Sequence, residues 1–98
     1  MTSTKVTSLT RMQEKFFSLL STFPHIETFW DRDSSEVNVD ALQNAMGGMS
    51  HGERVTAAFM LSVWTGNNHQ FDMIEAAACL DPEWRAVIVE WLRDPFWP

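Results

Sequence analysis

Four side chains of this sequence are of the types that hold zinc-like metals or act as strong nucleophiles: His25, His51, His69 and Cys79. Zinc sites usually have two ligands close together in the chain, as in C-x-x-C or H-x-x-x-H, and no two of these four residues have such a spacing. A reactive cysteine needs an electropositive setting, whereas Cys79 follows the carboxylate of Glu75 by one helical turn. The sequence therefore predicts no metal and no cofactor. A small metal-dependent protein or enzyme assembled from these four scattered residues is kept as an alternative.

The stretch DRDSSEVNVDAL, residues 31–42, begins like the calcium-binding loop of an EF-hand. Asp31, Asp33 and Ser35 have the ligand spacing of that loop. Its sixth position should be glycine and is Glu36, and its twelfth should be a bidentate glutamate and is Leu42. Because both diagnostic positions differ, the sequence favours an exposed acidic loop over a calcium site.

The signatures of common enzyme classes are missing from the sequence. It contains no G-x-S-x-G nucleophile elbow, no Walker loop and no dinucleotide-binding fingerprint. Because these signatures are missing, the sequence favours a protein without enzymatic activity. An enzyme is kept as an open alternative.

Residues about 70–79 and 82–93 have the lengths and the short connection of a helix-turn-helix pair. The outer face of the second helix carries Glu83 and Glu90, with Arg93 only at its far end. A recognition helix needs polar and basic residues on that face to reach bases and phosphates. The pair predicts an ordinary helical hairpin, and direct binding of nucleic acid is not expected.

Composition and charge narrow the class of protein further. The chain has 98 residues, 45% of them hydrophobic, and a formal net charge of −6 that repels phosphate backbones. A single cysteine cannot form an internal disulfide. The sequence begins without the apolar core of a signal peptide, and no apolar run reaches the roughly 20 residues that span a bilayer. We expect one domain over residues 1–98, located in the cytoplasm and not in a membrane.

The elements that would position these residues are helices. A first helix is predicted from residue 9 to Pro24, with Ser8 as its N-cap, and the first seven residues are expected to be frayed. Phe17 lies off the apolar stripe of this helix, which predicts an exposed ring. Residues 24–37 break the helical period and predict an ordered loop, which is pinned by Ile26, Phe29 and Trp30.

The middle of the chain predicts the centre of the fold. A short helix with Val39, Leu42, Ala45 and Met46 facing inward should end at Gly47-Gly48. The motif S-H-G-E then forms a capping box, since the Ser50 hydroxyl and the Glu53 carboxylate can each accept from a free backbone N–H. The helix that this motif begins, about 51–64, is apolar nearly all round and belongs in the middle of a bundle. Gly66 should end it.

Two more helices are predicted near the C-terminus. The first, about 70–79, should face the core with these residues: Phe71, Ile74, Ala77 and Ala78. The second has Asp81 as its cap and Pro82 at its first position, and the apolar spacing of helical period predicts these buried residues: Trp84, Val87, Ile88, Trp91 and Leu92. The fold class is thus all-α, a compact bundle of four to five short helices around a central buried helix.

Two sets of residues are candidates for contact with a protein partner. The apolar set consists of residues that one small bundle does not easily cover: Phe17, Trp30, Val89, Phe96 and Trp97. For Phe96 and Trp97, packing against the open end of the bundle is favoured over protrusion as an anchor. The acidic set is a candidate surface for a basic protein: Glu27, Asp31, Asp33, Glu36 and Asp40.

The sequence thus favours a non-enzymatic, acidic binding or accessory protein that acts through protein–protein contacts, with a homodimer as one form. An acidic regulator that occupies a basic site of its partner, for example by mimicking nucleic acid, is the alternative.

Overall fold

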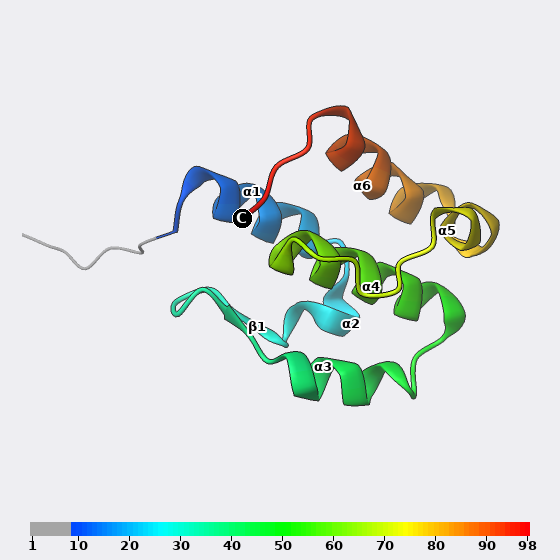
Figure 1. The fold of residues 1–98 in the computed structure, drawn as a ribbon, viewed down its shortest axis with the longest axis horizontal. Helices are drawn as coiled ribbons and strands as arrows, with labels where there is room; N and C mark the ends of the chain where they lie inside the picture. The colour runs from blue at the N-terminus through cyan, green and yellow to red at the C-terminus, as the bar shows by residue number, and fades with distance from the viewer. Residues whose placement is uncertain (1–8) are drawn as a thin grey trace, which may run out of the picture.

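The structure, a computed structural model, describes residues 9–98, so the predicted frayed segment and the predicted cap Ser8 lie outside its range. The described chain folds into six helices and a small hairpin (Figure 1). The helices are α1 (Arg11–Leu20), α2 (Pro24–Glu27), α3 (Val39–Met46), α4 (His51–Thr65), α5 (Met73–Cys79) and α6 (Pro82–Arg93). The hairpin pairs β1 (Trp30–Asp31) with β2 (Glu36–Val37) in antiparallel register. The all-α class is confirmed, with the single turn of α2 as an additional helix.

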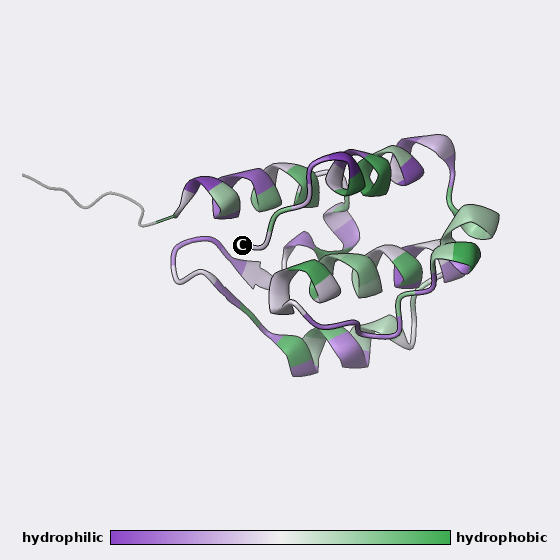
Figure 2. Ribbon diagram, turned by 45° about the horizontal axis from the view of Figure 1, so that its top comes forward, coloured by the Kyte–Doolittle hydropathy of each residue, from purple (hydrophilic) through white to green (hydrophobic). Residues whose placement is uncertain are grey.

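Helix α4 lies in the middle of the bundle, as predicted. Helices α1 and α6 lie on one side of it and α3 on the other, and apolar residues occur around its circumference (Figures 1 and 2). Every residue from 55 to 61 is buried, Thr56 included. The capping box forms as the sequence indicates: the Ser50 hydroxyl accepts from the Glu53 N–H at 3.2 Å, and the Glu53 carboxylate accepts from the Ser50 N–H at 3.0 Å. Gly66 ends the helix with φ of +75°.

Helix α1 begins two residues later than predicted, because Thr10 and not Ser8 caps it. The Thr10 hydroxyl accepts from the Gln13 N–H, and the Gln13 side chain accepts from the Thr10 N–H, both at 3.0 Å. The prediction that Phe17 is exposed is wrong, since only 2% of this residue is accessible. Its ring lies 5.8 Å from the Trp64 ring, and the Arg32 guanidinium covers it at 4.9 Å. The hairpin that carries Arg32 thus buries a second face of α1.

The segment predicted as an ordered loop contains α2 and the hairpin. Ile26 and Trp30 are both buried, and the Trp30 ring lies 5.5 Å from Phe16 of α1. Asp31 holds the turn of the hairpin, because its carboxylate accepts from the N–H groups of Asp33 and Ser34 at 2.9 and 3.3 Å. Trp30 is therefore part of the core and is not an exposed anchor for a partner.

The predicted orientation of the helix before α6 is wrong. Helix α5 begins at Met73, where the Asp72 carboxylate caps it by accepting from the Glu75 N–H at 3.0 Å. With this start only Ala76 of the helix is buried; Ala77 and Ala78 are exposed and Ile74 is 80% exposed.

Helix α6 begins as predicted, since the Asp81 carboxylate accepts from the Trp84 N–H at 3.0 Å and Pro82 follows the cap. Val87 and Ile88 are buried. Leu92, predicted to be in the core, is 44% exposed, because it lies on the flank of α6 beside an open groove. Among residues 9–98 no helix has both the length and the apolar character needed to cross a membrane.

Candidate interaction surface

The C-terminal segment turns back onto the bundle after α6. The Trp91 indole N–H donates to the Phe96 carbonyl at 2.8 Å, and this bond fixes the turn around Pro95. Phe96 is 7% exposed, and the Lys15 ammonium lies 4.7 Å from the centre of its ring. The favoured interpretation of Phe96, a ring that packs against the end of the bundle, is therefore confirmed, and Phe96 is not available as an anchor.

Trp97, the next residue, lies on the surface beside Phe96. The residue is 61% exposed, and its ring makes an edge contact with Trp91 at a centroid distance of 5.7 Å. A side chain added at Gly66 would place its Cβ 3.9 Å from the Trp97 ring, so the indole lies over the C-terminal end of α4. The favoured prediction that both rings of the tail pack against the bundle is therefore wrong for Trp97, because the turn that directs Phe96 inward leaves the next side chain on the surface.

Trp97 forms one wall of an apolar groove between the end of α4, the start of α5 and the flank of α6. The groove has a volume of about 240 Å³. Its apolar lining includes Phe59, Phe71, Met73, Ile88, Leu92 and Trp97. Four segments build it: α4, the start of α5, α6 and the tail, and α4 is separated in the chain from the last two.

The large apolar residues that are exposed within residues 9–98 all belong to this part of the molecule. They are Met73, Ile74, Val89, Leu92 and Trp97, which we call the apolar face. Met73, Leu92 and Trp97 line the groove itself. Val89 precedes Leu92 by three positions and so extends the surface beyond the groove, whereas Ile74, next to Met73 in the chain, points to a different side of α5.

The predicted apolar candidates are thus divided between core and surface. Phe17, Trp30 and Phe96 are buried, whereas Val89 and Trp97 belong to the apolar face. Sequence reasoning missed Met73, Ile74 and Leu92 as surface residues. A signal for the first two was present: Asp72 followed three positions later by Glu75 is a helix-start signature, which places Met73 and Ile74 in the exposed first turn.

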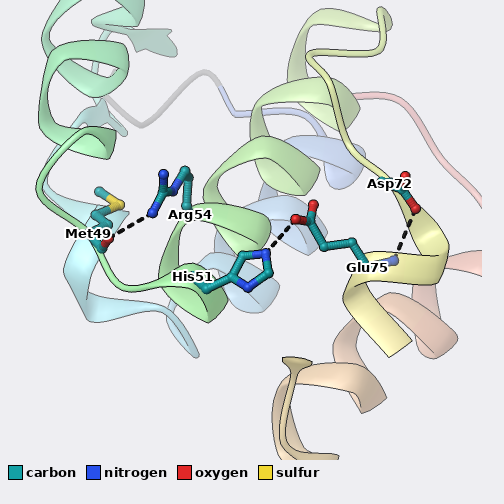
Figure 3. A network of polar contacts seen from close by, with 5 residues as sticks. All are labelled: Met49, His51, Arg54, Asp72 and Glu75. Carbon is teal, nitrogen blue, oxygen red and sulfur yellow. Dashed lines mark hydrogen bonds and ion pairs between the residues drawn. The ribbon is translucent and has the colours of Figure 1, made fainter. Parts of the chain in front are cut away.

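A polar contact links the start of α4 to α5 (Figure 3). The His51 imidazole pairs with the Glu75 carboxylate, while the Glu75 N–H donates to Asp72. Nearby, the Arg54 guanidinium donates to the Met49 carbonyl at 3.2 Å. Since both members of the pair are substantially exposed, the pair contributes little to stability.

The remaining metal-ligand candidates bond to separate groups. The His25 Nε2 lies 3.0 Å from the Thr56 hydroxyl, and its ring stacks on Trp84 at 5.1 Å. The His69 Nε2 lies 2.9 Å from the Thr65 hydroxyl. Cys79 is a free, partly buried thiol at the end of α5. Within residues 9–98, no three His, Cys, Asp or Glu side chains are grouped so that they could hold a metal ion.

The five candidate acidic residues all lie on the surface, on α2, the hairpin and the start of α3: Glu27, Asp31, Asp33, Glu36 and Asp40. A wide hollow of about 540 Å³ lies beside the hairpin, and Asp31, Glu36 and Asp40 are among its lining residues. Asp31 already satisfies two backbone N–H groups of the turn. The arrangement is that of a solvated acidic edge.

Comparisons of the chain with protein-family models, with curated proteins and with solved structures found no match.

Proposed function

We propose that this protein is a non-enzymatic binding module that acts through protein–protein contacts, and that the apolar face is its interface. The observation that supports the proposal is the gathering of exposed apolar side chains on α5, α6 and the tail, around a groove. Scattered apolar residues on a surface need no explanation, but a contiguous group beside a concave site is typical of an interaction surface.

The chemistry of the face fits this role. Trp97 offers a large, half-uncovered indole, and tryptophan is among the residues enriched at the energetic centres of interfaces. Met73, an unbranched and adaptable side chain, also lines the groove. The floor is rigid, because Phe59 belongs to the buried centre of α4.

A non-enzymatic role is favoured because the histidines and Cys79 do not form a catalytic group. His51 and His69 line the same hollow of about 260 Å³ beside α4, but they bond to different groups, Glu75 and Thr65, and His25 bonds to Thr56. A general base must lie within hydrogen-bond reach of the group that it activates, and none of these contacts pairs a histidine with the thiol of Cys79.

The test is affinity capture from an extract of the source organism with three versions of the protein. Trp97→Ala combined with Leu92→Ser removes the centre of the apolar face, and Gln43→Ala changes an exposed position of α3, away from the groove, as the control. Partners retained by the wild type and by Gln43→Ala should be lost with the double variant. Retention of the same partners by all three versions would contradict the proposal.

The alternative from the sequence, an acidic regulator of a basic partner, would use the carboxylates of residues 27–40 instead. It predicts that capture survives loss of the apolar face and fails when Asp33 and Glu36 are replaced by Asn and Gln. The same experiment therefore separates the two functions.

A further inference from the structure

We infer that the apolar groove receives a trimethylammonium group, carried on a trimethylated lysine side chain of the protein partner. The inference rests on the proposed function, since it names the chemical group with which the partner enters the same surface. Two features of the groove support it: the aromatic rings of its lining, and the end of helix α4 beside them.

Four aromatic rings line the groove, and each contacts the next. The Phe59 ring centroid lies 5.2 Å from that of Phe71 and 5.7 Å from that of Trp91. The Trp91 centroid in turn lies 5.7 Å from that of Trp97. The planes of these three pairs are inclined to each other by 58°, 84° and 81°. A rounded group can contact several rings inclined in this way, whereas a planar ligand stacks on one of them.

The lining favours a cation over an anion of the same shape. The face of an aromatic ring is the negative end of its quadrupole and attracts a cation within about 6 Å of the centroid. The neighbouring Phe96 shows the same chemistry within this chain, since the Lys15 ammonium lies 4.7 Å from its centroid. The charged residues of α6 and its C-cap are of both signs and do not line the groove: Glu83, Arg85, Glu90, Arg93 and Asp94.

The C-terminal end of α4 provides a second attraction for a cation. Ser62, Val63 and Gly66, at this end of the helix, line the groove. The last carbonyl groups of a helix carry a partial negative charge, which stabilises a cation placed beside them. The last turn of α4 contains no basic residue, and no basic residue of the described chain lines the groove. The negative end of the helix is therefore available to a cation from a partner.

The same lining selects a methylated ammonium over that of an ordinary lysine. A lysine ammonium has three N–H donors, and removing it from water without acceptors is costly. A trimethylammonium group has no N–H, and its methyl groups gain from contact with the rings and with Met73, Ile88 and Leu92. The groove, at about 240 Å³, is larger than the roughly 150 Å³ of a cavity that binds benzene. It thus has room for this group and the adjoining methylenes of a lysine.

A protein is the favoured source of the group because exposed apolar surface continues beyond the groove. Val89 is 51% exposed and lies one helical turn from Leu92 of the lining. Residues that flank the modified lysine in a partner can cover this surface, whereas a free trimethylammonium compound such as choline would leave it in water.

Titration of the complete, ¹⁵N-labelled protein tests the inference. The probe is trimethyllysine between two glycines, with both ends of the peptide blocked. One control peptide has unmodified lysine, and the other has a carbon atom in place of the trimethylammonium nitrogen and is neutral. The trimethyllysine peptide should shift the indole signals of Trp91 and Trp97 but not that of Trp30, and should bind about tenfold or more tightly than either control.

Variants locate the binding site. Trp97→Ala should weaken binding of the trimethyllysine peptide by about tenfold, whereas Trp97→Phe keeps a ring and should weaken it less. Asn67 lines the groove next to the end of α4, so Asn67→Lys places a cation there and should abolish binding. Asn67→Gln and the distant Gln43→Ala should bind as the wild type does. Circular dichroism checks that each variant remains folded.

Each alternative outcome overturns the inference. Equal binding of the three peptides would show apolar recognition without preference for a cation, and no binding of any would show that the groove holds no such group. Choline that binds as tightly as the trimethyllysine peptide would assign the groove to a small molecule or a lipid headgroup. Binding that survives Asn67→Lys occurs elsewhere. In all these cases, loss of captured partners with the double variant would leave the proposed function standing, whereas capture that does not depend on the apolar face would contradict both.

Discussion

Replacing Phe96 and Trp97 by alanine, one at a time, separates the structural role of the C-terminal tail from the role in binding that we propose for it. The two residues are neighbours and are similar in size. Phe96 is 7% exposed, and its ring lies beneath the ammonium of Lys15, whereas Trp97 is 61% exposed. Phe96→Ala should therefore destabilise the fold, and Trp97→Ala should leave stability nearly unchanged while weakening association.

The magnitudes follow from burial. Removing a buried phenylalanine ring costs about 3–5 kcal/mol, and the lower end applies here because a chain terminus can move to fill the space. The cation–π contact with Lys15 is part of this cost, at about 0.5–1 kcal/mol for an exposed cation. Trp97 loses mainly its edge contact with Trp91, which is worth about 1 kcal/mol.

Urea and thermal unfolding followed by circular dichroism measure both effects. For a domain of this size, 1 kcal/mol corresponds to a change of about 4–8 °C in Tm, so a loss of about 3 kcal/mol with Phe96→Ala should lower Tm by about 12–24 °C. Trp97→Ala should lower Tm by about 8 °C at most. Equal losses from the two substitutions would show that the tail does not pack with one ring inward and the other outward.

Other positions give independent predictions. Leu61→Ala should cost about 2–5 kcal/mol in urea unfolding, because Leu61 is buried in the central helix. Gly66→Ala should cost about 1–2 kcal/mol, since φ of +75° is unfavourable for alanine, and thermal unfolding measures the change. Ser50→Ala should cost about 1 kcal/mol through loss of the N-cap, again measured in urea. The hydrogen bond from the Ser50 N–H lowers the pKa of Glu53 below its ordinary value of 4.5. The resulting stabilisation is complete above the pKa of Glu53 in the unfolded chain and is lost as the pH falls through the lower pKa of the folded protein. Glu53→Gln should therefore lose less stability than the wild type between neutral and acidic pH, measured by urea unfolding at a series of pH values.

The helix boundaries that the sequence predicted correctly depend on short-range signals. Ser50 and Glu53, Gly66, and the Asp81-Pro82 pair all act within one turn of the helix that they begin or end. Such contacts form wherever the local backbone is helical, so tertiary structure does not need to be known. The burial of α4 could also be predicted from the sequence. A helix without a polar face would expose apolar side chains in any orientation on the surface.

Helix α5 was predicted with the wrong face inward because it has only two turns. Over seven residues the apolar period is nearly as compatible with one orientation as with another, and starting the helix a few residues early rotates its predicted face. The Asp72 cap fixes the true start, and with it the exposure of Met73 and Ile74.

The burial of Phe17 and Trp30 depends on contacts between distant segments. Helical periodicity places Phe17 only relative to its own helix, and nothing local indicates that Arg32 of the hairpin covers its ring. The groove has the same origin, because α4, α6 and the tail meet only in the folded chain. The sequence thus named Trp97 and Val89 as candidates for an interaction but did not predict the groove beside them.

The five tryptophan indole groups allow the most direct test of the apolar face as an interface. In a ¹H–¹⁵N spectrum each indole N–H gives its own signal, and Trp97 is on the face while Trp30 is in the core. As a captured partner is added, the Trp97 signal should shift and become protected from a soluble paramagnetic agent, and the Trp30 signal should stay constant. Association that leaves the Trp97 signal unchanged and accessible would show that the protein binds through another surface.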